Sequence, residues 1–128
     1  MPISGDKPSK DELRAQYLDL MKKVLTNWVY AESELIESKP TGLPGKLVCA
    51  FVDAFGFRLA RPQRGDLAQR LEGRDWPPSA HTMAGMKRLD NLQKCAESVL
   101  QDGVPGDFIE TGVWRGGTVI LMRAILKA

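Results

Sequence analysis

The residues best placed for chemistry form a glycine-rich turn near the end of the sequence. Glu110 is followed by Gly112 and then by Gly116 and Gly117, and this spacing differs from the dinucleotide fingerprint G-x-G-x-x-G. Glycines at such a turn let a ligand approach the backbone, and they expose amides at the N-terminus of the next helix. An acidic residue beside them adds an acceptor for a ligand ammonium or hydroxyl group. The pattern suits the amino-acid and ribose portions of S-adenosylmethionine better than a pyrophosphate, although an ordinary tight turn capped by Glu110 stays open as an alternative.

Three elements are predicted to position this turn. Residues 107–112 predict a short strand that enters the turn, and residues 118–127 predict an apolar helix that leaves it. Residues 82–102 predict a longer helix, because apolar residues recur on one face and Gly103 with Pro105 ends the pattern. Strand, glycine turn and helix together make the first half of a βαβ unit.

The first half of the chain is predicted to be mostly helical. Ser9 and Glu12 form a capping-box pattern that starts a helix over about residues 10–32. Its apolar face is predicted to contain Leu13, Tyr17, Leu20, Met21, Val24, Leu25 and Trp28. Residues 38–46 predict a loop, and residues 47–59 predict a further apolar helix that could be packed, part of a lid or part of a subunit contact. Residues 61–80 predict a second connection, which ends at Trp76 and two prolines.

Length and composition exclude several classes of protein. A chain of 128 residues suits one ordinary domain, and a net charge of +2 does not indicate a nucleic-acid partner. No apolar run is long enough to span a membrane, and the first residues do not read as a secretory signal. Cys49 and Cys95 have no metal-site spacing. We expect a cytoplasmic protein whose two thiols are reduced and buried.

A single predicted strand has a consequence for the extent of the domain. A strand covered by a helix needs parallel neighbours at its edges, and an ordinary sheet has about five or six strands. We therefore expect the chain to be the opening part of a longer α/β domain. Taken alone, such a chain is expected to be at best marginally stable and to self-associate or remain partly disordered.

Four stretches of the sequence carry a resemblance to a known family. They are residues 74–83, 86–93, 102–107 and 109–117, the last reading IETGVWRGG, and residues 17–30 are similar as well. These stretches resemble the macrocin and mycinamicin sugar O-methyltransferases, which depend on S-adenosylmethionine and magnesium, and the resemblance is to the N-terminal half of that family. It implies a class I (Rossmann-like) methyltransferase fold preceded by N-terminal helices. Residues 1–80 would form a helical N-terminal or lid region, and residues 81–128 the incomplete start of the cofactor-binding domain.

The resemblance also implies site residues. The expected S-adenosylmethionine contacts are Thr82, Met83, Glu110, Thr111, Gly112, Val113, Trp114, Arg115, Gly116 and Gly117. Trp76 and Met83 are expected to contact the acceptor. No catalytic residue is assigned, since His81 is open to interpretation as a general base or as a capping residue. No metal ligand is expected within this chain, because the family's magnesium-binding aspartates would lie beyond Ala128.

The implied activity is methyl transfer from S-adenosylmethionine to a sugar or other hydroxyl of a secondary metabolite, and the chain alone is expected to be inactive. The expected partner is a small, glycosylated hydroxyl acceptor, with a homo-oligomer open as an alternative to a monomer. Two other functions remain. One is a fragment of a nucleotide-dependent oxidoreductase, which would need an acidic ribose-binding residue about 20 positions further on. The other is a non-catalytic remnant or interaction module that docks through residues 47–59.

Overall fold

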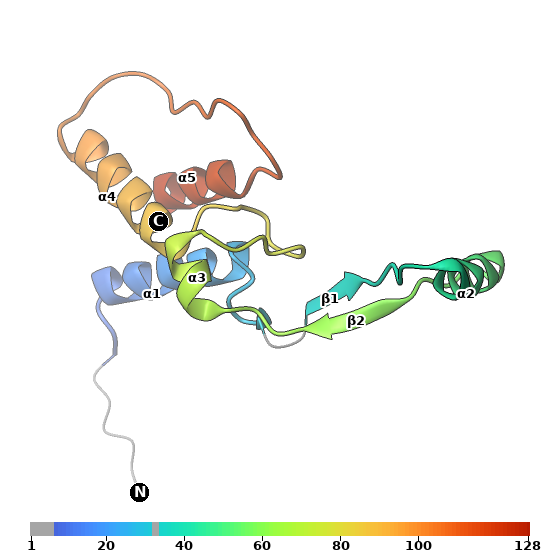
Figure 1. Cartoon of the computed structure of the whole chain (residues 1–128). Helices are drawn as coiled ribbons and strands as arrows, with labels where there is room; N and C mark the ends of the chain where they lie inside the picture. Colours follow the sequence, from blue (N-terminus) through green and yellow to red (C-terminus); the bar gives the residue numbers. More distant parts are fainter. Residues whose placement is uncertain (1–6, 32–33) are drawn as a thin grey trace, which may run out of the picture.

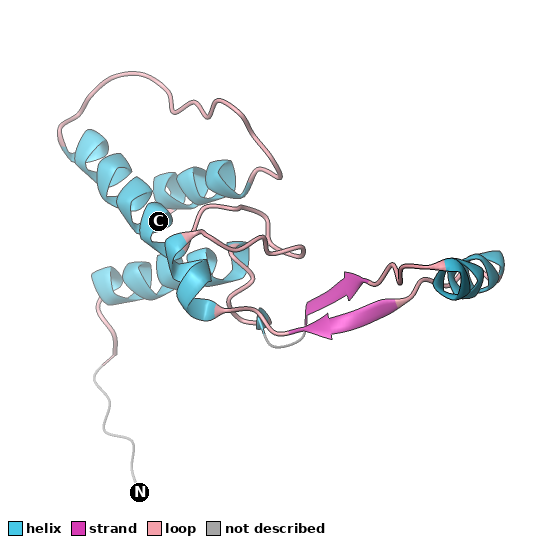
Figure 2. Cartoon of the chain, in the orientation of Figure 1, coloured by secondary structure: helices cyan, strands magenta, loops and turns pink. Residues whose placement is uncertain are grey.

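The computed structural model describes residues 7–31 and 34–128, which divide into a helical body and a projecting arm (Figures 1 and 2). The elements in chain order are α1 (Lys10–Leu25), β1 (Glu34–Glu37), α2 (Leu43–Ala54), β2 (Ala60–Gln63), α3 (Leu67–Glu72), α4 (Met86–Gln101) and α5 (Gly117–Lys127). The body consists of α1, α3, α4 and α5. The arm, residues 34–63, consists of β1, β2 and α2, with α2 at its tip. The architecture is therefore mixed, with helices and one small sheet.

The core of the body lies where α1, α4 and α5 meet. Its buried members are Leu18, Leu25, Leu89, Ala96, Leu121, Ala124 and Ile125, with Met21, Ala84, Leu92 and Phe108 packed against them. The predictions of a helix within residues 82–102 and another over 118–127 are confirmed. The first helix begins only at Met86, and the second begins one residue early, at Gly117.

Helix α1 begins as predicted but ends early. The Ser9 amide donates to Glu12 Oε2 at 2.7 Å and the Glu12 amide donates to Ser9 Oγ at 3.2 Å, so the capping box is confirmed. The prediction that the helix reaches residue 32 is wrong, because Asn27 has a φ of 53° and leaves the right-handed helical region; residue 32 itself lies outside the described residues. The predicted apolar face is only partly right. Leu25 is buried as predicted, whereas Leu13, Tyr17, Leu20 and Val24 are about half exposed; Leu18, which the prediction did not include, is fully buried.

The arm differs most from the sequence predictions. Helix α2 begins inside the predicted loop 38–46 and ends before residue 59, so both boundaries were wrong. Pro44 is tolerated in its first turn, where the missing amide has no partner to lose. Gly56, with a φ of 75°, follows the end of the helix. Strands β1 and β2, which were not predicted, pair antiparallel from Glu34 opposite Gln63 to Glu37 opposite Ala60.

The predicted strand at residues 107–112 is wrong for this structure. These residues belong to a long loop, 102–116, which arches from the end of α4 to the start of α5 (Figure 1). A strand exists only when a neighbouring strand takes its backbone hydrogen bonds. Among the described residues, the one strand pair is β1 with β2, and it lies in the arm.

A buried ion cluster fixes the arm to the body. Arg70 of α3 is 2% exposed, and its guanidinium binds Glu34 Oε2 at 3.2 Å and Asp75 Oδ2 at 2.7 Å. Arg70 also donates to the backbone oxygen of Asn27 at 2.9 Å, while Asn27 Nδ2 donates to Glu34 Oε1 at 2.7 Å. Since Glu34 opens β1, the base of the arm is held by charge-assisted hydrogen bonds on both carboxylate oxygens.

Two further expectations concern the thiols and membranes. Cys49 is half-buried and Cys95 is exposed, so the prediction that both would be buried is wrong, although both are free. Cys95 lies on the solvent side of α4, whose core face is set by Leu89 and Ala96. Across residues 7–31 and 34–128, none of the helices has the length and apolar character needed to span a membrane.

Candidate functional site

A cavity of about 200 Å³ lies where the glycine turn meets the segment before α4. Three pieces of chain enclose it: residues 81–84 with Arg88, the turn from Glu110 to Gly116, and the first residues of α5. Its lining comprises His81, Thr82, Met83, Ala84, Arg88, Glu110, Gly112, Trp114, Arg115, Gly116, Gly117 and Thr118. The fold therefore brings two predicted segments, separated by nearly thirty residues in sequence, to one hollow.

Glycine geometry holds these segments together. Gly112 and Gly116 have φ values of 80° and 77°, a region that side chains with a Cβ rarely adopt. Gly117 has a different role, because a Cβ there would lie 2.6 Å from the backbone oxygen of His81 and 2.8 Å from Thr82 Cβ. Instead, the Gly117 amide donates to His81 O at 3.0 Å. The N-terminus of α5 is thus in direct backbone contact with residues 81–82.

Glu110 presents an unpartnered acceptor at this cavity. Its Oε2 atom is shielded from solvent and accepts no hydrogen bond from the described residues. An unsatisfied buried acceptor is unfavourable, and a ligand that donates a hydrogen bond there would remove the penalty. Thr82, which is 6% exposed, is already engaged, since its Oγ1 accepts from the Ala84 amide at 3.0 Å. An ammonium or hydroxyl donor is therefore the chemistry that this hollow fits.

Arg115 and two tryptophans form the outer wall. The Arg115 guanidinium lies 4.3 Å from the centre of the Trp114 ring and donates to Pro78 O at 2.6 Å and to Ala80 O at 3.1 Å. Trp114 in turn meets Trp76 edge to face, with ring centroids 5.9 Å apart. Trp76 remains 68% exposed. The loop that carries Trp76 is therefore fastened to the glycine turn, while most of the Trp76 side chain stays exposed.

Most, but not all, of the residues singled out in the sequence come together here. The cavity is lined by Thr82, Met83, Glu110, Gly112, Trp114, Arg115, Gly116 and Gly117, as expected for one site, whereas Thr111 and Val113 do not line it. Trp76 lies outside the cavity, against Trp114. Sequence reasoning missed Ala84 and Thr118, and it left Arg88 and His81 unassigned. The position of Thr118, directly after the glycine pair at a helix N-terminus, was the available signal.

A metal site is not present among the described side chains. No group of three or more His, Cys, Asp or Glu residues that could hold a metal ion occurs in residues 7–31 and 34–128. The described residues therefore do not form a magnesium site, and we assign no metal-dependent chemical step to them.

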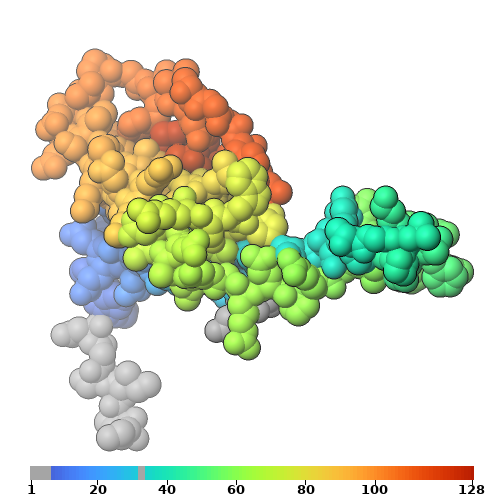
Figure 3. Space-filling model, viewed as in Figure 1, coloured from blue at the N-terminus to red at the C-terminus, as the bar shows by residue number. Residues whose placement is uncertain are grey.

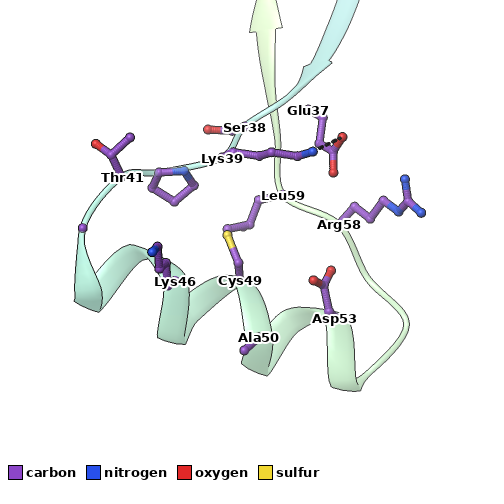
Figure 4. A pocket seen from close by; sticks show the side chains of 12 residues that line it. Glu37, Ser38, Lys39, Thr41, Lys46, Cys49, Ala50, Asp53, Arg58 and Leu59 are labelled. Atoms are coloured by element: carbon purple, nitrogen blue, oxygen red, sulfur yellow. Dashed lines mark ion pairs between the residues drawn. The ribbon is translucent and has the colours of Figure 1, made fainter.

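A larger cavity of about 540 Å³ lies in the arm (Figure 4), and no residue of the glycine turn lines it. It is lined by charged side chains of both signs, including Glu37, Lys39, Lys46, Asp53 and Arg58. None of the predicted site residues contributes to it. Since no described polar atom in it is both buried and unpartnered, the smaller cavity is the stronger candidate for a functional site.

The candidate site thus combines a glycine turn that opens a helix with an unpartnered carboxylate oxygen beside it. The family model described as macrocin-O-methyltransferase (TylF) matches residues 14–128. The chain belongs to this family.

Characterised proteins of the same kind match most of the chain. It is 50% identical over 118 residues to the 8-demethyl-8-(2,3-dimethoxy-alpha-L-rhamnosyl)-tetracenomycin-C 4'-O-methyltransferase of Streptomyces olivaceus, with 92% of this chain and 37% of that protein covered. It is 46% identical over 112 residues to two others, the mycinamicin III 3''-O-methyltransferase of Micromonospora griseorubida and the demethyldecarbamoylnovobiocin O-methyltransferase of Streptomyces niveus, covering 88% of this chain and 36% of each.

A solved structure agrees with these relatives. The O-methyltransferase NovP superimposes with a TM-score of 0.63 at 42% identity, covering 89% of this chain and 36% of that one. The chain thus spans a little over a third of the length of the proteins that it matches.

Proposed function

We propose that this chain supplies the first cofactor-binding segment of an S-adenosylmethionine-dependent O-methyltransferase. The observation that carries the proposal is the unpartnered Glu110 Oε2 at the mouth of a glycine turn, in a chain of the macrocin-O-methyltransferase family. In this proposal, residues 81–128 open a class I, Rossmann-like domain, and the segment before residue 81 supports it. The family favours this reading over a nucleotide-dependent oxidoreductase.

The residues lining the cavity have separate roles in the proposal. The Glu110 carboxylate accepts hydrogen bonds from the donor groups of the cofactor, and Gly112 with Gly116 keeps the backbone free of side chains where the cofactor lies. Thr82 and Met83 close the opposite side. S-adenosylmethionine, when bound, supplies an activated methyl group on a positively charged sulfur. The chain's own contribution is to hold that group in a fixed orientation, which lowers the entropic part of the barrier.

The proposed acceptor is a sugar hydroxyl of a glycosylated secondary metabolite. The names of the three relatives describe methyl transfer to a rhamnosyl tetracenomycin, to mycinamicin III and to demethyldecarbamoylnovobiocin. The exposed Trp76 ring supports such an acceptor, because sugars bind on exposed aromatic rings next to polar groups. Arg115 would keep this ring in place through Pro78 and Ala80.

Calorimetric titration of the full chain with S-adenosylhomocysteine, and separately with NAD, tests the cofactor. We expect S-adenosylhomocysteine to bind and NAD not to bind. Glu110→Gln is expected to weaken that binding about 10- to 100-fold, which corresponds to the roughly 1.5–3 kcal/mol of a charged hydrogen bond. Glu72→Gln, which alters an exposed carboxylate outside the cavity, serves as the matched control and should leave the affinity unchanged.

Other outcomes point to the alternatives. Binding of NAD alone would reject the methyltransferase proposal. Binding of neither ligand would favour a non-catalytic remnant or an interaction module.

A further inference from the structure

The cavity at the glycine turn is lined by charged side chains of both signs. Among the described residues that line it, Glu110 supplies a carboxylate, and Arg88 and Arg115 supply two guanidinium groups, which stay positive at any ordinary pH. The cationic side chains of the arm do not contribute, because the arm projects from the body (Figure 3) and none of its residues lines this cavity. A ligand in the hollow therefore meets a negative and a positive group together.

The two arginines differ in whether a protein group already holds them. Arg115 donates to the backbone oxygens of Pro78 and Ala80, and its guanidinium lies over the Trp114 ring. Arg88 is exposed and forms no ion pair with another residue of 7–31 and 34–128. Arg88 is therefore the cation of this cavity that remains available to a ligand.

The position of Arg88 in α4 is unfavourable for the helix itself. Arg88 lies in the first turn, where the helix dipole favours anions and disfavours cations. This turn contains no acidic residue, and no side chain caps it. The other cation of the turn, Lys87, is paired with Glu72. A charge that opposes local stability and has no partner among the described residues is typical of a functional position.

The starts of two helices open onto the same hollow. Ala84 and Arg88 line it from the start of α4, and residues 116–118 line it from the start of α5. The amides of a first helical turn carry partial positive charge, and neither helix has a side-chain cap that would occupy them. With Arg88, they favour a negatively charged ligand group, whereas the buried, unpartnered Glu110 Oε2 favours a donor.

The size of the cavity limits which part of the cofactor it can hold. Sites for a whole drug-sized ligand measure about 300–1,000 Å³, whereas this cavity measures about 200 Å³. One end of S-adenosylmethionine is an α-amino acid with an ammonium and a carboxylate, and the other end is an uncharged adenosine. A small cavity that presents both charges fits the amino-acid end.

We propose that Arg88 binds the α-carboxylate of the cofactor while Glu110 binds its α-ammonium, an inference that rests on the proposed function. A guanidinium presents parallel N–H donors, which match the two oxygens of a carboxylate. The two side chains recognise the amino-acid end by both of its charges. The cavity thus selects adenosine derivatives that keep the carboxylate and discriminates against decarboxylated ones.

Calorimetric titration of the full chain with two ligands tests the inference. S-adenosylhomocysteine has both charged groups, and its decarboxylated form keeps only the ammonium. We expect the parent chain to bind S-adenosylhomocysteine about 10- to 100-fold more tightly, as the strength of a charged hydrogen bond implies. Arg88→Met should lose this preference by weakening S-adenosylhomocysteine alone. Arg88→Lys should keep part of the preference, because it keeps the charge but loses the planar fork.

Two further variants separate this role of Arg88 from others. Lys87→Met removes a cation from the same turn of α4, outside the cavity, and should leave both affinities unchanged. Glu110→Gln should weaken both ligands, because both have the ammonium. Urea unfolding should show that Arg88→Met is at least as stable as the parent, since the substitution removes an uncompensated cation from the first turn.

The results distinguish a failure of this inference from a failure of the proposed function. If the parent binds S-adenosylhomocysteine and Arg88→Met weakens both ligands equally, or neither, the inference is wrong and the proposed function stands. A clear loss of stability in Arg88→Met would also overturn the inference, because it would assign Arg88 to the support of the fold. A parent chain that binds neither ligand would overturn both.

Discussion

Arg70 shows how a single side chain can decide the arrangement of a small molecule. It is almost fully buried and reaches Asn27, Glu34 and Asp75, which come from the end of α1, the start of the arm and the loop after α3. A buried charge is tolerated only when its hydrogen bonds are satisfied. Here the partners are present for both Arg70 and Glu34, so the cluster fixes geometry at the junction of body and arm.

Replacing Arg70 by methionine should therefore be strongly destabilising. The variant leaves the Glu34 carboxylate buried without its cation, and the loss of one partner of a buried pair typically lowers the free energy of unfolding by about 3–5 kcal/mol. Urea unfolding followed by circular dichroism measures this loss. Lys87→Met is the control, because Lys87 pairs with Glu72 at the surface, and it should change the free energy of unfolding far less than Arg70→Met does. Equal effects of the two substitutions would contradict the role of the buried cluster.

The residues of the candidate site and the buried Arg70 differ in how far the sequence alone could predict their roles. The glycine turn could be predicted because its residues are close together in the sequence. Its glycines also indicate a turn directly, since glycine adopts positive φ values that other residues rarely do. Arg70 could not be found in this way. Its partners lie up to 43 residues away, and an arginine in a polar stretch reads as an exposed residue until the fold brings Glu34 beside it.

At the scale of elements, α1 and α4 are joined by charges as well as by the core. Arg14 Nη1 binds Glu97 Oε1 at 2.8 Å, and Lys22 Nζ binds Asp90 Oδ1 at 2.5 Å. Hydrogen bonds from Gln93 and then from Arg14 lower the pKa of Glu97 below its ordinary value of 4.5, and this outweighs the opposing effect of burial. The ionised carboxylate is thus favoured in the folded state.

This shift predicts an acid dependence of stability with a definite sign. Because the folded pKa of Glu97 is lower than the unfolded one, its contribution is fully present above pH 4.5 and is lost as the pH falls through the folded value. The pair is partly exposed, so the contribution is limited to about 0.5–1 kcal/mol. Denaturant unfolding at pH 7 and at pH 3 should show Glu97→Gln less stable than the parent only at the higher pH. A difference of the same size at both pH values would refute the assignment.

The elements also show why helices were easier to predict than strands. Helices α4 and α5 follow from periodic apolar residues and from stop signals such as Gly103, all of which are local. Strands β1 and β2 are four residues each, polar in part, and separated by α2, so their pairing depends on contacts that no local pattern states. The expected strand at 107–112 had the right residue types but has no neighbouring strand among the described elements.

At the scale of the whole molecule, two of the places where large apolar side chains are exposed lie outside the helical core. One is helix α2 of the arm with the residue after it, where Leu43, Leu47, Phe51 and Phe55 are between 64% and 75% exposed. The other is the loop 102–116, where Ile109 and Val113 are 85% and 54% exposed, and where a cavity of about 360 Å³ separates the loop from the ends of α4 and α5. In both places the side chains are of the apolar types that normally form a packed core, but here they are left exposed. The buried core of α1, α4 and α5 must therefore stabilise the body with little help from either.

This distribution leads to an expectation for the 128-residue chain studied alone. The free energy of unfolding of an ordinary domain, about 5–15 kcal/mol, is a small difference between large opposing contributions. Apolar side chains that stay exposed at the loop and the arm do not contribute the hydrophobic stabilisation that their burial would give. We expect a broad, weakly cooperative thermal transition and no methyl transfer above background, because the glycine turn and residues 81–84 enclose only one side of a cofactor. Calorimetry and a transfer assay with S-adenosylmethionine, magnesium and several hydroxylated acceptors would measure both. A sharp transition accompanied by turnover would show that the described elements suffice for a functional site, and that the loop around Glu110 closes over the cofactor without strands beside it.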